Sequence, residues 1–133
     1  QTTRPKLIIN TMDTIIFGTC SIICFSALFL HELKGTPLMM PPLKSSDLDG
    51  NVKALLTFSW HVGSILTVGI GVLFACSVLI PGNELMAIIG TVMLIFQALL
   101  ALGLAFKDVN LRKTPAPFLW PFVSMLALMG HIF

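Results

Sequence analysis

Histidines are the side chains of this sequence best suited to hold a cofactor or move a proton. His61 lies about two turns inside a long apolar stretch, where an ionisable group is costly and often functional. A neutral imidazole at that depth can form a hydrogen bond with a neighbouring helix, relay protons, or act as an axial ligand of haem or chlorophyll. We favour an interhelical hydrogen bond, with axial ligation by His61 as the alternative.

His31 ends the preceding apolar stretch, on the side of the protein where the stretch containing His61 begins. The two imidazoles could form a bis-histidine haem site, but upright helices would separate their depths by roughly 10 Å. Glu32 and Lys34 follow directly, a setting typical of an ordinary residue at a membrane interface. His31 is therefore a weaker cofactor candidate than His61, and His131, near the opposite surface, cannot complete the site.

Two further polar side chains lie within apolar stretches. Asp13 is the one carboxylate there, and Gln97 is the lone amide near the middle of another stretch. Together with His61, they are the groups from which a small transporter or membrane enzyme would build a polar path. No second carboxylate, lysine or arginine lies at depth to complete a relay, so hydrogen bonding between helices is the favoured role.

Sequence motifs for catalysis, metal binding and nucleic-acid binding are missing. Cys20 and Cys24 share a helix face, but Cys76 does not complete a set of ligands, so no metal site is predicted. No Ser-His-Asp grouping or glycine-rich phosphate loop occurs in a supporting context, and we name no catalytic residue. The net charge of +2, with scattered basic residues, is unlike a nucleic-acid-binding surface.

One face of the apolar stretch that contains His61 carries small side chains at every fourth position. Such a strip allows another helix backbone to approach closely. His61 is two positions from the nearest members, which is roughly 200° around a helix, so it points away from the strip. We expect one face to pack through the strip and the other to meet a second helix, a cofactor or another protein. The strip consists of Ser59, Gly63, Thr67, Gly71 and Ala75.

The elements that carry these residues are long and apolar. Of 133 residues, 56% are hydrophobic and 11% are charged, whereas soluble domains contain roughly one-quarter charged residues. At ~1.5 Å per residue, such stretches can cross a hydrocarbon core of roughly 30 Å. The sequence predicts an all-α integral membrane protein, a four-transmembrane-helix antiparallel bundle forming a single membrane domain over 1–133. Its helices are expected at about 7–31, 53–80, 85–106 and 117–133, with an interfacial loop at 32–52.

Local signals mark the ends of two of these helices. Pro81-Gly82-Asn83 predicts a tight turn, which would join its two flanking helices as an antiparallel hairpin. Asp49 is among the N-cap candidates for the helix that contains His61.

Basic residues are unequally divided between the two sides of the expected bundle. Arg4 and Lys6 lie on one side, and six basic residues lie on the other. By the positive-inside rule, both termini are predicted on the non-cytoplasmic side of a bacterial inner membrane or an organellar membrane. The six are Lys34, Lys44, Lys53, Lys107, Arg112 and Lys113.

The favoured function is that of a small polytopic accessory or structural subunit of a larger membrane protein complex, packing through its helix faces. Its expected partners are the lipid bilayer, bound lipids and other transmembrane subunits, and not nucleic acid. The alternative is a haem- or (bacterio)chlorophyll-binding membrane protein with His61 as axial ligand. A further alternative is a small transporter or membrane enzyme, with an enzyme the less favoured.

Overall fold

The computed structural model describes residues 11–133, and the expected start of the first helix near residue 7 lies outside this range. The described residues are helical apart from short turns and contain no β-strand, which confirms the predicted all-α fold. The elements in chain order are α1 (Thr11–Leu30), the π turn η1 (His31–Gly35), α2 (Thr36–Ser45), α3 (Gly50–Leu79), α4 (Glu84–Lys107), the 3-10 turn η2 (Leu111–Lys113) and α5 (Ala116–Gly130).

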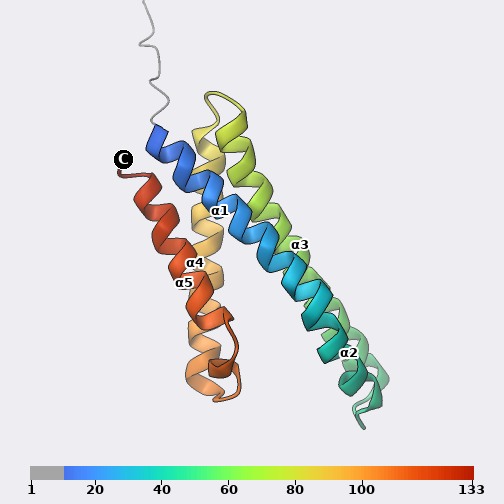
Figure 1. The fold of residues 1–133 in the computed structure, drawn as a ribbon. Helices are drawn as coiled ribbons and strands as arrows, with labels where there is room; N and C mark the ends of the chain where they lie inside the picture. The colour runs from blue at the N-terminus through green and yellow to red at the C-terminus, as the bar shows by residue number, and fades with distance from the viewer. Residues whose placement is uncertain (1–10) are drawn as a thin grey trace, which may run out of the picture.

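The four main helices form a ring in which each one contacts the next. α1 lies against α3, α3 against α4, α4 against α5, and α5 against α1, and neighbours run in opposite directions (Figure 1). In Figure 1 the α1/α3 pair diverges from the α4/α5 pair toward the end where α2 lies. The helices therefore lie closest together at the end where α1 begins and α3 meets α4.

Three helical stretches are long and apolar enough to cross a membrane: Thr11–Ser45, Gly50–Leu79 and Glu84–Lys107. α5 has 15 residues. At ~1.5 Å per residue it is about 22 Å long, which is shorter than a hydrocarbon core of roughly 30 Å. Only 28%, 28% and 33% of the apolar windows of the three long stretches are buried, so most of their surface is free to face lipid or another protein.

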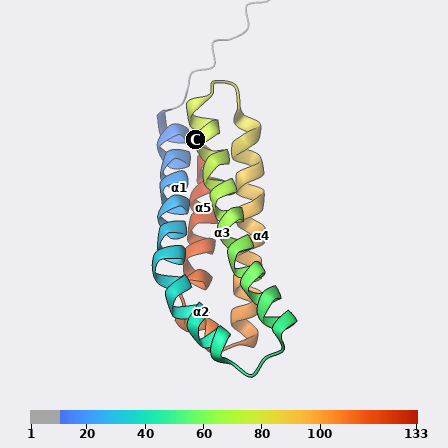
Figure 2. The ribbon, with the colours of Figure 1, turned by 90° about the vertical axis from the view of Figure 1, so that its right-hand side faces the viewer.

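The predicted loop at 32–52 is wrong over most of its length. α1 continues through η1 into α2, and only residues 46–49 lie outside a helix before α3 begins (Figure 2). In the sequence, Gly35 and Pro37 indicate the end of a helix. Proline is nevertheless tolerated in the first turn of a helix, which is where Pro37 lies in α2. The π turn just before Pro37 widens the helix, with the Thr36 N–H donating to the carbonyl oxygen of His31. Residues 31–45 therefore prolong α1.

Both ends of α3 agree with the local sequence signals. Asp49 is the N-cap residue, and its side chain accepts a hydrogen bond of 2.8 Å from the backbone N–H of Asn51. At the other end, Gly82 adopts φ +79° in the turn before α4, a conformation that costs glycine little. The predicted cap and the predicted hairpin are confirmed.

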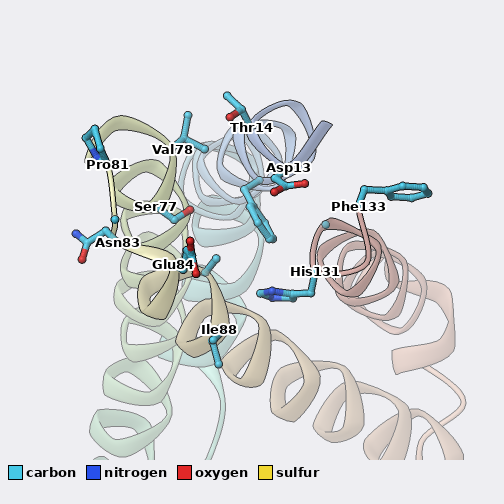
Figure 3. A pocket seen from close by; sticks show the side chains of 14 residues that line it. Asp13, Thr14, Ser77, Val78, Pro81, Asn83, Glu84, Ile88, His131 and Phe133 are labelled. Atoms are coloured by element: carbon cyan, nitrogen blue, oxygen red, sulfur yellow. The ribbon is translucent and has the colours of Figure 1, made fainter. Parts of the chain in front are cut away.

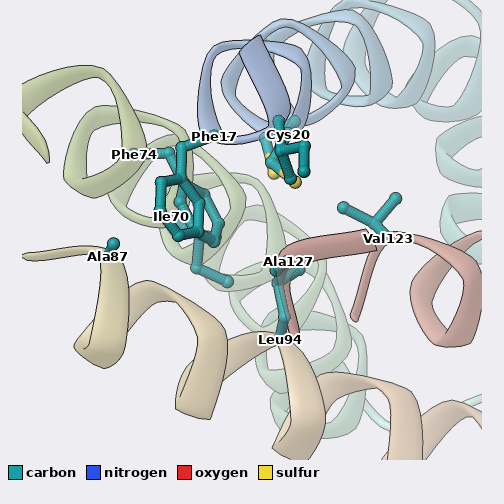
Figure 4. Close-up of a cluster of buried hydrophobic side chains, with 10 residues drawn as sticks. Phe17, Cys20, Ile70, Phe74, Ala87, Leu94, Val123 and Ala127 are labelled. Carbon is teal, nitrogen blue, oxygen red and sulfur yellow. The ribbon is translucent and has the colours of Figure 1, made fainter. Parts of the chain in front are cut away.

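Phe74 of α3 belongs to the buried core and lies beside Phe17 and Ile70 (Figure 4). Its ring stacks on that of Phe17 in α1, with 5.7 Å between the ring centroids. The same ring covers Gly90 of α4, where an added Cβ atom would lie 3.2 Å from Phe74 Cζ. One aromatic side chain thus joins three helices at the closed end of the bundle. The remaining core residues are Ile16, Cys20, Cys24, Ile70, Ala87, Leu94, Val123 and Ala127.

Candidate functional site

A polar cluster surrounds Glu32 in η1, where the continuous α1–α2 helix widens. Oε1 of Glu32 lies 3.4 Å from Nδ1 of His61 and 3.6 Å from Nδ1 of His31. The Ser64 hydroxyl donates a short hydrogen bond to the same oxygen, and the Thr36 hydroxyl donates to Oε2 at 3.0 Å. One carboxylate therefore gathers two imidazoles and two hydroxyls from facing helices. We call these five residues, with Trp60, the Glu32 cluster.

The continuation of α1 into α2 explains why His61 and His31 meet. α3 begins beyond the end of α2 and runs back alongside it, as the hydrogen bond of 3.1 Å from Lys53 Nζ to the carbonyl oxygen of Lys44 shows. Because several turns of α3 pass α2 first, His61 reaches the level of His31. The predicted difference in depth of roughly 10 Å is therefore wrong for the two rings, since it assumed a loop where the chain is helical.

Trp60 covers one side of the cluster. Its indole stacks on the imidazole of His31, with 3.9 Å between centroids and 21° between the ring planes. Trp60 Nε1 also donates to the Thr36 hydroxyl at 2.9 Å. Gly35 makes room for the indole, because a Cβ atom there would lie 2.9 Å from Trp60 Cζ2. The plane of the His31 ring is therefore held by its neighbours.

The hydrogen-bond roles determine the tautomers of the two imidazoles in their neutral form. Ser64 gives its single hydroxyl proton to Glu32, so its oxygen accepts from Nδ1–H of His31, 3.0 Å away. Nδ1 of His61 lies 3.4 Å from Oε1 of Glu32, so the proton of the neutral ring is favoured on this nitrogen. Each ring then keeps its free lone pair on Nε2, and neither Nε2 atom has a hydrogen-bond partner among residues 11–133.

His61 is the better placed of the two imidazoles to hold a cofactor. Metal-ligating histidines commonly donate one ring N–H to a carboxylate and bind the metal through the other nitrogen. His61 stands in this relation to Glu32, and 46% of its side chain is exposed. His31 has one ring face covered by Trp60. A bare metal ion has no such site, since no three His, Cys, Asp or Glu residues in the described part of the chain are suitably grouped.

Gly71 is the member of the predicted small-residue strip at which two helices approach closely. Its carbonyl oxygen accepts a buried hydrogen bond of 2.9 Å from the hydroxyl of Ser21 in α1. An added Cβ atom on Gly71 would lie 3.3 Å from Cys24 Cβ. Thr67 is also buried, and Ala75 is partly buried. This part of the strip lies within the bundle and packs against α1 at Gly71.

The other part of the strip, Ser59 and Gly63, remains exposed. Gly63 borders an apolar groove of about 340 Å³ between α3 and α4, and a Cβ atom added to it would meet nothing within 4 Å. Gln97 of α4 also lines this groove, and no described residue forms a hydrogen bond with its amide. The groove thus contains an unpaired amide among apolar side chains. The apolar side chains that line the groove are those of Leu66, Ile70, Met93, Phe96 and Leu100.

A second cavity, of about 320 Å³, lies at the end of the bundle where α1 begins (Figure 3). Asp13 of α1, Glu84 at the start of α4 and His131 after α5 all border it. Oδ1 of Asp13 is buried and has no hydrogen-bond partner among the described residues. The His131 ring packs against that of Phe17, with centroids 5.0 Å apart. We call this space the Asp13 cavity.

The polar groups considered for a transporter or membrane enzyme do not converge. Asp13 lines the cavity at one end of the bundle, and Gln97 lines the groove between α3 and α4. His61 borders neither space and lies in the Glu32 cluster. In the described structure these three side chains occupy three separate places.

Glu32, Thr36 and Glu84 are site residues that the sequence alone does not indicate. Glu32 and Thr36 are four positions apart, which places them on one face of a helix, and this signal was hidden by the expectation of a loop. Glu84 follows the hairpin turn directly, and no spacing in the sequence relates it to Asp13.

No protein-family model matches this chain, and no curated protein or solved structure shows significant similarity to it.

Proposed function

We propose that this chain is a small polytopic accessory subunit of a larger membrane complex, and that it receives another transmembrane helix in the groove between α3 and α4. The observation that carries the proposal is the Gln97 amide, which lies in this apolar groove without a hydrogen-bond partner among residues 11–133. In lipid an unpaired amide is costly, whereas a hydroxyl, amide or carbonyl group of a second helix would satisfy it. Gly63 leaves room for that helix to come close.

The proposal places α1, α3 and α4 across a bilayer, with α5 as a shorter fourth crossing. Large apolar side chains support this placement, since Ile65, Phe96 and Phe122 are each more than half exposed. Six basic residues lie at the end that holds α2 and η2, whereas Arg4 and Lys6 precede α1. The positive-inside rule then puts both termini on the non-cytoplasmic side.

A photo-crosslinking side chain at Leu100, which lines the groove, tests the proposal in intact membranes. We expect a discrete transmembrane protein to be linked at Leu100. Gln97→Leu removes the amide and Gly63→Leu fills the groove. Gln97→Leu should lower the yield about threefold or more, as expected for an interhelical hydrogen bond of ~0.6–1.7 kcal/mol. Gly63→Leu should lower it as well, because the larger side chain occupies the space of the second helix. The matched position is Met125 of α5, which is 67% exposed, lies outside the groove and should give no such product.

The mass of the protein in a mild detergent provides the second readout. A stable assembly with another membrane protein is expected. A lone monomer that is labelled only by lipid, equally at Leu100 and Met125, would contradict the proposal. A crosslinked product of twice the chain mass would replace a foreign subunit by a second copy of this chain.

The Glu32 cluster favours one second function, the binding of haem or chlorophyll through Nε2 of His61. The observation behind it is the carboxylate on the Nδ1 side of the ring, at 3.4 Å, which leaves Nε2 as the free nitrogen. Protein purified from membranes of its native source should then absorb visible light. His61→Ala should abolish this absorption and Glu32→Gln should weaken it, while Ser59→Ala, on the far face of α3, should leave it unchanged. A colourless preparation would remove this second function.

A further inference from the structure

The Asp13 cavity presents hydrogen-bond acceptors on several sides. Figure 3 shows Asp13, Glu84 and His131 around the same space, from the start of α1, the start of α4 and the end of α5. Oδ1 of Asp13 is fully covered and unpaired among the described residues. A carboxylate that lines a cavity without a partner is costly, and the described residues supply no hydrogen-bond donor for Asp13.

Two neighbouring hydroxyl groups, those of Thr91 and Ser77, donate their protons to backbone carbonyl oxygens. The Thr91 hydroxyl donates to the carbonyl oxygen of Ala87 at 2.8 Å, so Thr91 Oγ1 accepts from Nε2–H of His131, 2.9 Å away. In its neutral form, His131 then keeps an acceptor lone pair on Nδ1. The Ser77 hydroxyl, also at the cavity, donates to the carbonyl oxygen of Phe74 at 2.8 Å and retains only acceptor capacity. The lining is therefore rich in acceptors.

Charge and size narrow the class of ligand. Asp13 and Glu84 bring two carboxylates to the cavity, and no lysine or arginine of the described chain borders it. Its volume of about 320 Å³ far exceeds the roughly 10–15 Å³ that one water requires. Residues 11–133 contain no group of three metal ligands here or elsewhere. A cation larger than a metal ion, carrying several N–H donors, matches these properties best.

We propose that the Asp13 cavity binds a primary ammonium group. A primary ammonium has three donors and no acceptor, the complement of Asp13, Glu84 and the acceptor side of His131. A quaternary ammonium lacks N–H donors and would leave the acceptors of this lining unpaired.

The ammonium group can come from an aminophospholipid headgroup or from a free amine in solution. The test uses the purified full chain in a mild detergent, with native mass spectrometry as the readout. The probes are phosphatidylethanolamine and phosphatidylcholine with identical acyl chains, and soluble ethanolamine as a competitor. Phosphatidylethanolamine should bind about tenfold more tightly than phosphatidylcholine, because only its headgroup donates hydrogen bonds to charged acceptors.

Two variants show whether the cavity is the binding site. Asp13→Asn should reduce the preference for phosphatidylethanolamine about tenfold. Glu84→Gln, at an exposed position where folding is not at stake, should reduce it in the same direction. Asp47→Asn is the matched control, because this exposed carboxylate lies in the turn between α2 and α3 at the other end of the bundle. Its preference should equal that of the unmodified chain.

The outcomes separate the two sources and can overturn the proposal. Displacement by soluble ethanolamine supports a free amine as the ligand, whereas preference for the lipid without displacement supports a headgroup. Equal binding of both lipids, or a preference that survives both Asp13→Asn and Glu84→Gln, overturns the proposal. Lipid binding that appears only after Lys6→Gln would overturn an external amine as the ligand, because the cavity would then hold an ammonium group of this chain. None of these results depends on the groove between α3 and α4.

Discussion

Replacing Phe74 by alanine is expected to lower the free energy of unfolding by about 2–4 kcal/mol. Phe74 has 0% exposure and stacks on Phe17, and its ring also fills the space over Gly90. Our proposal places these helices in lipid, where transfer of an apolar side chain from lipid to the protein interior contributes little free energy. The loss therefore comes from van der Waals contacts that no other atom replaces around the cavity. Unfolding by sodium dodecyl sulfate in mixed micelles, followed by circular dichroism, measures it.

Phe58→Ala is the matched control for this prediction. Phe58 lies on the same helix and has the same side chain, but it is 66% exposed. Its truncation should change the free energy of unfolding by no more than about 0.5 kcal/mol. Equal losses for Phe58→Ala and Phe74→Ala would show that the stacked ring does not hold α1, α3 and α4 together.

The parts of the fold that the sequence predicts well are those decided by local chemistry. Two long apolar runs separated by Pro81-Gly82-Asn83 predict two helices joined by a tight turn. The structure contains both helices and the turn. Asp49 is likewise recognisable as a cap, because its side chain needs only the backbone N–H groups that follow it. Such features depend on neighbours within one turn of the chain.

The helical continuation at residues 31–45 was not predicted because local signals oppose it. Gly35, Pro37, Pro41 and Pro42 each lower the intrinsic preference for a helix. The structure accommodates them with a π turn and with contacts to α3, such as the hydrogen bond from Trp60 to Thr36. Contacts between segments far apart in the sequence therefore override the propensity of this segment.

In the candidate sites, too, the sequence indicates what depends on local chemistry but not what depends on contacts between distant segments. The depth of His61 in an apolar stretch indicates a candidate site residue, whereas its partner Glu32 lies in a segment for which the sequence predicts a loop. The sequence shows Asp13 as an isolated carboxylate, whereas its position beside Glu84 and His131 depends on how three helices are rotated. The spacing of residues reveals which side chains share a face of one helix, but not which faces of different helices meet.

Adding one methyl group at Gly130 is expected to destabilise the protein by about 1–3 kcal/mol. The new Cβ atom of Gly130→Ala would lie 2.7 Å from Cε1 of Phe17 and 3.0 Å from Cγ2 of Ile16. Phe17 cannot move away freely, because it is buried and its ring lies between those of Phe74 and His131. The clash therefore forces α5 away from α1. The same unfolding assay in mixed micelles measures the loss.

Gly18→Ala is the control for Gly130→Ala, because an added Cβ atom at Gly18 in α1 meets nothing within 4 Å. There alanine should stabilise the helix by up to about 1 kcal/mol, so the two substitutions should have opposite signs. Shortening the obstructing ring in Gly130→Ala/Phe17→Leu should cost less than the sum of the two single changes, since the clash is then relieved. Additive losses, or stabilisation by Gly130→Ala, would mean that α1 and α5 do not meet at this glycine. Because Phe17 and His131 also border the Asp13 cavity, Gly130→Ala should weaken ammonium binding as well, whereas Gly18→Ala should not.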